Sequence, residues 1–151
     1  MKTILVPIDG SEYSERAILK AKELAECLGS KIILMNIMSI VTTVSYYPNP
    51  RFAQASAGID WPSLYEKAKE KSAKLIEESK NLLHGVDVET VILDEPSGKF
   101  ATAIVEFANE HNVDLIVMGS NGMGSLRRRL YLGSVTTKVL HMTEKPVMVI
   151  Q

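Results

Sequence analysis

Small residues gather in one segment of the chain, and their spacing suits the binding of a phosphate group. Four of the nine glycines lie at positions 119, 122, 124 and 133, and Ser134 follows the last of them at the predicted start of a helix. Glycines let backbone N–H groups approach an anion closely, and a helix N-terminus adds partial positive charge. The segment is a candidate phosphate site, with Ser134 as a hydroxyl donor. A loop that needs only positive φ angles and a capping serine would give the same pattern.

Asp9 is a second candidate, because it directly follows the apolar run Ile4–Ile8. A carboxylate at the end of a buried strand could accept hydrogen bonds from a ribose, or could hold Mg²⁺ beside phosphates. It could equally cap the following helix or form an Asx turn. The residue alone leaves both interpretations open.

The end of the next apolar run, Asn36–Met38, carries no ionisable group. The backbone N–H and C=O of Ile37 could bind the edge of an adenine, with apolar side chains covering the ring. Ordinary packing at a strand end is the alternative.

Other features argue against several classes of function. The net charge is −1, and Arg127–Arg129 stands without interleaved aromatic residues, so we expect a solvated basic face or one arginine on terminal phosphates, and no nucleic acid. The three histidines and Cys27 lack the spacing of a zinc site, and no Ser, His and Asp are paired as in a hydrolase. The sequence favours binding over catalysis.

Alternating strands and helices must position these residues. Apolar runs predict strands over 4–8, 31–36, 86–93, 115–118 and 147–150, and helical periodicity predicts helices over 11–28, 63–83, 100–112 and 134–142. This order predicts one doubly wound α/β domain over residues 1–151, with a single open five-stranded parallel sheet. A ligand then binds beyond the carboxyl ends of the strands, at the switch in strand order. Residues 39–62 interrupt the pattern as a long loop.

The bulk composition is that of an ordinary globular domain, with 46% apolar and 23% charged residues among 151. One cysteine fits a reducing compartment, and the first apolar run is shorter than that of a signal peptide. No stretch approaches the roughly 18 apolar residues of a membrane span. We expect a cytoplasmic protein without a membrane partner.

Over essentially its whole length the sequence resembles the universal stress protein family. The segments that carry the resemblance are Ile4–Ser11, Asp114–Ser120, Leu132–Val135 and Lys145–Ile150, in this order and spacing. The resemblance implies that ATP is the ligand, with or without Mg²⁺ at Asp9, and that the protein acts as a nucleotide-responsive stress or signalling module.

The resemblance also implies the residues of the site. It implies Asp9 at the ribose, the Ile37 backbone at adenine, and Gly119, Gly122, Gly133, Ser134 and the Val135 backbone at the phosphates, with Pro7 and Met118 completing the set. ATP-binding members carry Gly-x2-Gly-x9-Gly-Ser/Thr, whereas here ten residues separate Gly122 from Gly133. One residue inserted between Ser125 and Leu132 would account for this, and it leaves the donor positions over 123–132 open.

A homodimer through the last strand is implied too, and pairing would cover an exposed apolar edge. Proline at Met148 is expected to break it. Three alternatives compete with nucleotide binding alone: a slow ATPase or nucleotidyl-transferring enzyme, a family member that does not bind nucleotide, and a phosphoacceptor domain. A phosphoacceptor domain would need several carboxylates after the first strand, where Asp9 stands alone.

Overall fold

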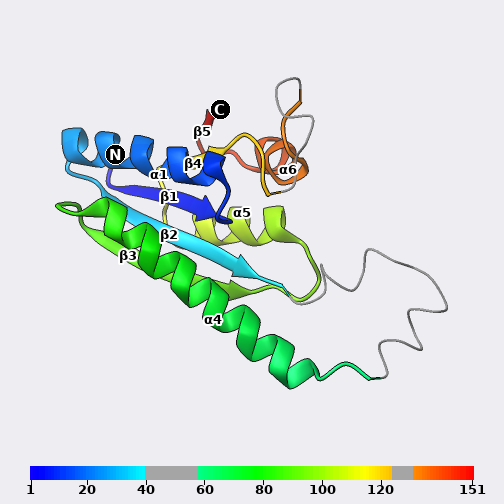
Figure 1. The fold of residues 1–151 in the computed structure, drawn as a ribbon. Helices are drawn as coiled ribbons and strands as arrows, with labels where there is room; N and C mark the ends of the chain where they lie inside the picture. Colours follow the sequence, from blue (N-terminus) through cyan, green and yellow to red (C-terminus); the bar gives the residue numbers. More distant parts are fainter. Residues whose placement is uncertain (40–57, 124–130) are drawn as a thin grey trace.

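The computed structural model describes residues 1–39, 58–123 and 131–151. Its strands are β1 (Thr3–Ile8), β2 (Lys31–Met38), β3 (Val88–Asp94), β4 (Leu115–Gly119) and β5 (Val147–Ile150). They form one parallel sheet in the order β3-β2-β1-β4-β5 (Figure 1). The predicted open five-stranded parallel sheet is confirmed. The strand order reverses between β1 and β4, and this is the place where we expect a ligand from the sequence.

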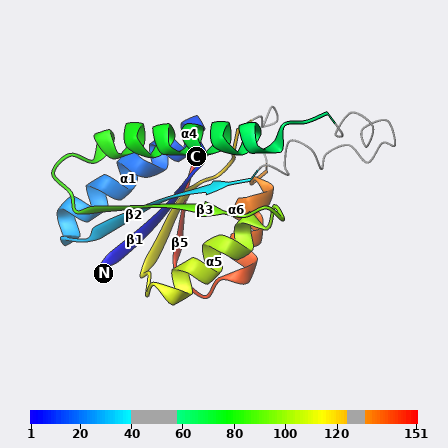
Figure 2. The ribbon, with the colours of Figure 1, turned by 90° about the horizontal axis from the view of Figure 1, so that it is seen from below.

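Helices cover both faces of the sheet (Figure 2). They are α1 (Glu12–Leu28), α4 (Trp61–Lys80), α5 (Phe100–Glu110) and α6 (Ser134–Met142), with a short 3-10 turn, η1 (Asn81–Leu83), after α4. In Figure 2, α1 and α4 lie on one side of the strands, and α5 and α6 lie on the other. Parallel strands need such crossovers, and both faces of the sheet are thereby buried.

The strands divide their side chains between two core clusters, because successive residues of a strand point to opposite faces. The α1–α4 core cluster takes Ile4, Val6 and Ile8 of β1, together with Ile32 and Leu34 of β2. The α5–α6 core cluster takes Leu5, Ile33, Met35, Ile116 and Met118, together with residues of α5 and Val139 of α6. Runs that are apolar at every position are therefore required in the central strands.

The ends of α1 follow the sequence signals. Ser11 is the N-cap, and its hydroxyl accepts a hydrogen bond from Ser14 N–H at 3.1 Å. Gly29 closes the helix in the left-handed conformation, with φ 63°. The α1 N-terminus is thus fixed directly after Asp9 and Gly10.

Two predicted starts differ by two residues, and three predicted ends differ as well: β2 continues to Met38, α4 ends at Lys80 before η1, and α5 ends at Glu110. Helix α4 begins at Trp61 rather than Ser63, because Asp60 caps it and Pro62 is tolerated in a first helical turn. Strand β3 begins at Val88 rather than Val86, because Val86 N–H donates to Leu83 O and so belongs to the turn after η1. The Arg127–Arg129 triplet, Gly124 and most of the predicted loop over 39–62 lie outside the described residues. Within the described part of the chain, no helix combines the length and the apolar character that a bilayer crossing requires.

Candidate functional site

A pocket of about 870 Å³ opens at the carboxyl ends of β1 and β4. This volume lies within the ordinary range of small-molecule sites. All nine residues expected from the sequence line it: Pro7, Asp9, Ile37, Met118, Gly119, Gly122, Gly133, Ser134 and Val135. They come from β1, β2, β4, the loop after β4 and the start of α6, so the sheet brings together residues up to 128 positions apart (from 7 to 135).

Asp9 joins two loops at one edge of this pocket. Its Oδ1 accepts a hydrogen bond from Ser11 N–H at 2.9 Å, which forms an Asx turn before α1. Its Oδ2 accepts another from Met123 N–H at 3.1 Å, across to the loop that follows β4. Within the protein, Asp9 therefore forms an Asx turn and does not cap the helix, since Ser11 is the cap. A carboxylate has further lone pairs, so a ligand hydroxyl is not excluded.

The glycines of the site are explained by close approach and not by positive φ. Among Gly119, Gly122 and Gly133, none has a positive φ. A Cβ on Gly119 would lie 2.7 Å from Tyr13 Cβ in α1, and one on Gly122 would lie 2.8 Å from Asp9 Oδ2. The alternative interpretation, a loop that needs only positive φ at these glycines, is therefore wrong.

Gly133 allows the start of α6 to lie against the loop after β4. Its Cβ would meet Asn121 Cα and Ser120 O at 3.3 Å, and its N–H donates to Ser120 O at 2.7 Å. Gly133 is also the N-cap of α6, with φ −62° and ψ 157°, and makes no side-chain capping hydrogen bond. The first N–H groups of a helix have no intrahelical partner, so those of Ser134 and Val135 are available to an anion at the pocket wall.

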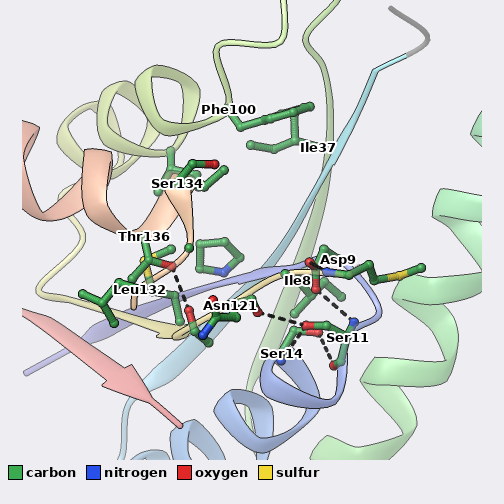
Figure 3. Close-up of a pocket in the computed structure, with 18 of the residues that line it drawn as sticks. Ile8, Asp9, Ser11, Ser14, Ile37, Phe100, Asn121, Leu132, Ser134 and Thr136 are labelled. Carbon is green, nitrogen blue, oxygen red and sulfur yellow. Dashed lines mark hydrogen bonds between the residues drawn. The ribbon is translucent and has the colours of Figure 1, made fainter. Parts of the chain in front are cut away.

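Apolar side chains form another part of the pocket. Ile37 and Val135 are joined there by Met35, Phe100 and Ile104. Figure 3 shows Phe100 and Ile37 at one end of the view, with Asp9 and Ser11 further along the pocket. Sequence reasoning missed Phe100 and Ile104. An aromatic residue at the first position of a helix that follows a strand of the same sheet was the available signal.

The backbone of Ile37 faces the pocket edge. Lys31 N–H donates to Lys2 O, whereas Ile32 N–H donates to Asp87 O, so alternate peptide groups of β2 point to β1 and to β3. This alternation turns the peptide groups of Ile37 toward β1. Because β1 ends at Ile8, which pairs with Asn36, the Ile37 carbonyl lies beyond the end of β1.

Buried polar groups link the pocket wall through contacts that sequence reasoning did not predict. Thr136 Oγ1 donates to Gly119 O at 2.9 Å, and Ser11 Oγ donates to Asn121 O at 3.5 Å. The side chains of Ser11, Asn121 and Thr136 line the pocket and are buried (Figure 3). These contacts tie the start of α6 and the start of α1 to the loop after β4.

Metal ligands do not cluster in the described ranges 1–39, 58–123 and 131–151, which hold no group of three His, Cys, Asp or Glu side chains able to bind a metal ion. Any Mg²⁺ near Asp9 would need most of its ligands from phosphates and water, which is a usual arrangement for this ion.

Comparison with known proteins places the chain. The model of the universal stress protein family matches residues 1–151. A universal stress protein of Methanocaldococcus jannaschii is 31% identical over 152 residues, which cover 99% of this chain and 82% of the relative. The chain belongs to the universal stress protein family.

Solved universal stress proteins share the fold. One from Archaeoglobus fulgidus, in complex with dAMP, aligns with a TM-score of 0.63 at 23% identity and covers 100% of this chain and 98% of its own. A universal stress protein in complex with cAMP aligns with a TM-score of 0.68 at 23% identity, covering 99% and 97%. The α/β architecture described above is thus that of universal stress proteins.

Proposed function

We propose that this universal stress protein binds an adenine nucleotide, ATP with Mg²⁺ carried on its phosphates, in the pocket between β1 and β4. The observation that carries the proposal is the division of that pocket. Apolar side chains around Ile37 and Phe100 form one part, and the uncapped start of α6 at Ser134 forms another. A nucleotide has the same division between its base and its phosphates.

The carbonyl of Ile37 supports adenine as the base. An acceptor at the pocket edge can take a hydrogen bond from the 6-amino group of adenine, whereas guanine presents a 6-oxo acceptor there. An unmade polar pair of this kind costs about 1–3 kcal/mol. Two family members have been solved with the adenine nucleotides cAMP and dAMP, which agrees with this assignment.

The start of α6 supports a phosphate at the other end. Gly133 leaves no Cβ between the loop after β4 and the helix, and as the N-cap it has no side chain to cap the first turn. The N–H groups of Ser134 and Val135 and the Ser134 hydroxyl would then bind phosphate oxygens. Gly119 and Gly122 would contribute backbone at the loop, and Pro7 and Met118 would line the pocket floor between the two ends.

Binding and signalling are proposed in preference to turnover. Both oxygens of Asp9 accept backbone hydrogen bonds, which makes this carboxylate a poor general base for activating water. The nucleotide then acts as a signal that the protein senses.

Calorimetric titration with ATP tests the function, and GTP at the same concentration tests the base. We expect ATP binding and at least tenfold weaker GTP binding. Incubation of ATP with excess protein, followed by chromatography, should return ATP and not ADP. Equal affinity for GTP would overturn the assignment of Ile37, and stoichiometric conversion to ADP would favour an enzyme.

A homodimer through β5 is part of the proposal. β5 is an edge strand whose four residues are only half-buried in the single chain. Ile116 N–H donates to Pro146 O and Ser120 N–H donates to Ile150 O, so the even-numbered peptide groups of β5 face β4. The peptide groups of Val147 and Val149 point outward, where a second copy of β5 could pair with them.

A further inference from the structure

Asp9 is connected to the phosphate end of the pocket through the loop after β4. Its Oδ2 accepts Met123 N–H at 3.1 Å, although the two residues are 114 positions apart in the sequence. Among the described residues, its two chain neighbours aside, the atoms within 4 Å of a Cβ on Gly122 would be Oδ2 and Cγ of this same carboxylate. The loop therefore lies directly against Asp9.

Met123 also packs on the other side of the same turn. Gly10 has φ +83°, and a Cβ built there would lie 3.7 Å from Met123 Sδ and 3.5 Å from Leu75 Cδ1 of α4. Met123 is thus held by a hydrogen bond to Asp9 and by packing over Gly10.

The beginning of the loop holds the start of α6. Ser120 O accepts Gly133 N–H at 2.7 Å, and Gly119 O accepts Thr136 Oγ1 at 2.9 Å. A continuous set of contacts therefore runs from the Asp9 carboxylate through residues 119–123 to the first turn of α6. Displacing one end of the five-residue segment 119–123 moves the other, since so short a segment has little freedom to absorb the change.

We propose that Asp9 is a positioning residue for the phosphate-binding part of the site. Its carboxylate fixes the loop at Met123 and, through the loop, the N–H groups at the start of α6. This inference rests on the proposed nucleotide function and adds to it. Loss of the carboxylate should weaken binding of the phosphates themselves, and not only of a sugar hydroxyl.

The test compares three ligands in the parent protein and in Asp9→Ala: ATP, 2′,3′-dideoxy-ATP and inorganic tripolyphosphate. We expect the substitution to raise the Kd of all three by a similar factor, on the order of tenfold or more. If Asp9 acts only by binding the ribose, the loss will appear with ATP and be absent with the other two ligands. That result would overturn the proposal.

Asp60→Ala is the matched control, because Asp60 also accepts a backbone N–H, that of Ser63 at the start of α4, and does not line the pocket. It should leave all three affinities unchanged. An equal loss in this control would show that the Asp9→Ala effect is a general loss of stability, and would overturn the proposal.

A second measurement needs no nucleotide. The amide proton of Met123 donates to a carboxylate, so its NMR resonance in the parent protein should shift markedly upfield in Asp9→Ala and stay unchanged in Asp60→Ala. An unmoved resonance overturns the proposal. If the resonance shifts in Asp9→Ala as expected but the parent protein binds none of the three ligands, the proposed function is overturned instead. The two failures are therefore distinguishable.

Discussion

The Asp9 carboxylate occupies the space into which a side chain at position 122 would extend. A Cβ on Gly122 would lie 2.8 Å from Asp9 Oδ2, and the next nearest atom of the described residues outside its chain neighbours, Asp9 Cγ, would be 4.0 Å away. The clash therefore comes from one side chain, and the absence of a side chain at position 122 is explained by a contact within the protein before any ligand is considered.

Gly122→Ala should lower the free energy of unfolding by about 1–3 kcal/mol, the usual cost of forcing an extra carbon into a packed site. In an Asp9→Ala background the same change should cost less than about 0.5 kcal/mol, because the clashing atoms are gone and φ at this position is not positive. Urea denaturation of the four proteins gives the coupling. Additive effects would contradict this account of Gly122.

Gly119→Ala should destabilise the fold more severely. The new Cβ would lie 2.7 Å from Tyr13 Cβ and 2.8 Å from the Tyr13 backbone carbon, and backbone cannot rotate away. We expect a loss of about 3 kcal/mol or more in the free energy of unfolding. Gly58→Ala is the control, since no atom of the described residues outside its chain neighbours lies within 4 Å of its added Cβ, and its φ is not positive. Equal stability of the two variants would show that α1 and β4 can separate freely.

Ser134→Pro should remove two phosphate donors, the backbone N–H and the hydroxyl, without unfolding α6. Ser134 is the first residue of the helix, where proline is favoured, and Gly133 already has the extended backbone, φ −62° and ψ 157°, that a residue before proline requires. ATP affinity should fall at least roughly tenfold, since one lost hydrogen bond to a charged group already costs about that much and two are lost here. Ser134→Ala separates the hydroxyl from the N–H. Unchanged ATP affinity in calorimetric titration of Ser134→Pro would move the phosphates away from α6.

The register of β5 changes how the dimer must be tested. Met148 N–H faces β4, so proline at Met148 breaks the sheet within one chain and does not report on the dimer. Val149→Pro removes only an outward N–H. At micromolar concentration we expect the parent protein to sediment as a dimer and Val149→Pro as a monomer with similar thermal stability. A monomeric parent would mean that this edge is not an interface.

Asp114 should make the fold sensitive to acid. Its carboxylate accepts the N–H groups of Lys2 at 2.6 Å and Thr3 at 2.9 Å, which lower the pKa of Asp114 below its ordinary value of 3.8. The ionised form is therefore favoured by folding. Its stabilisation is complete above pH 3.8 and is lost as the pH falls through the lower folded pKa.

Thermal melts of the parent protein and Asp114→Ala across this range check the prediction. The difference in Tm should be small, because the group is exposed, and it should narrow as the pH falls below 3.8. A difference that stays constant at low pH would show that the charge of Asp114 contributes nothing.

The strands were predictable because each is a short apolar run and parallel sheets need such runs on both faces. Boundaries at Trp61 and Val88 were missed, since a cap at Asp60 and a turn after η1 decide them locally. The sequence marked the glycines of the site as positions that need no side chain. It did not show which residues of the protein would clash with one. Tyr13 and Asp9 approach them from distant parts of the sequence, and only the packed structure shows those distances.

Phe100 and Ile104 illustrate the same limit within the pocket. Both have the spacing of an ordinary core face on α5, and nothing in that pattern separates a residue that meets the core from one that meets a ligand. The crossover to α5 brings them over the ends of β1 and β2.

One part of the pocket wall is at the same time part of the α5–α6 core cluster. Met35, Ile104 and Met118 line the pocket and are at least 95% buried, whereas Ile37 and Phe100 are partly exposed. In evolutionary terms the two groups are under unequal constraint. A substitution at Met35 that reshaped the base site would also open or overfill the core, whereas Ile37 only packs against the outside of that cluster and Phe100 is not among its residues. New ligand preferences in descendants of this chain should therefore arise first at Ile37 and Phe100, with the core residues changing only after stability has been gained elsewhere.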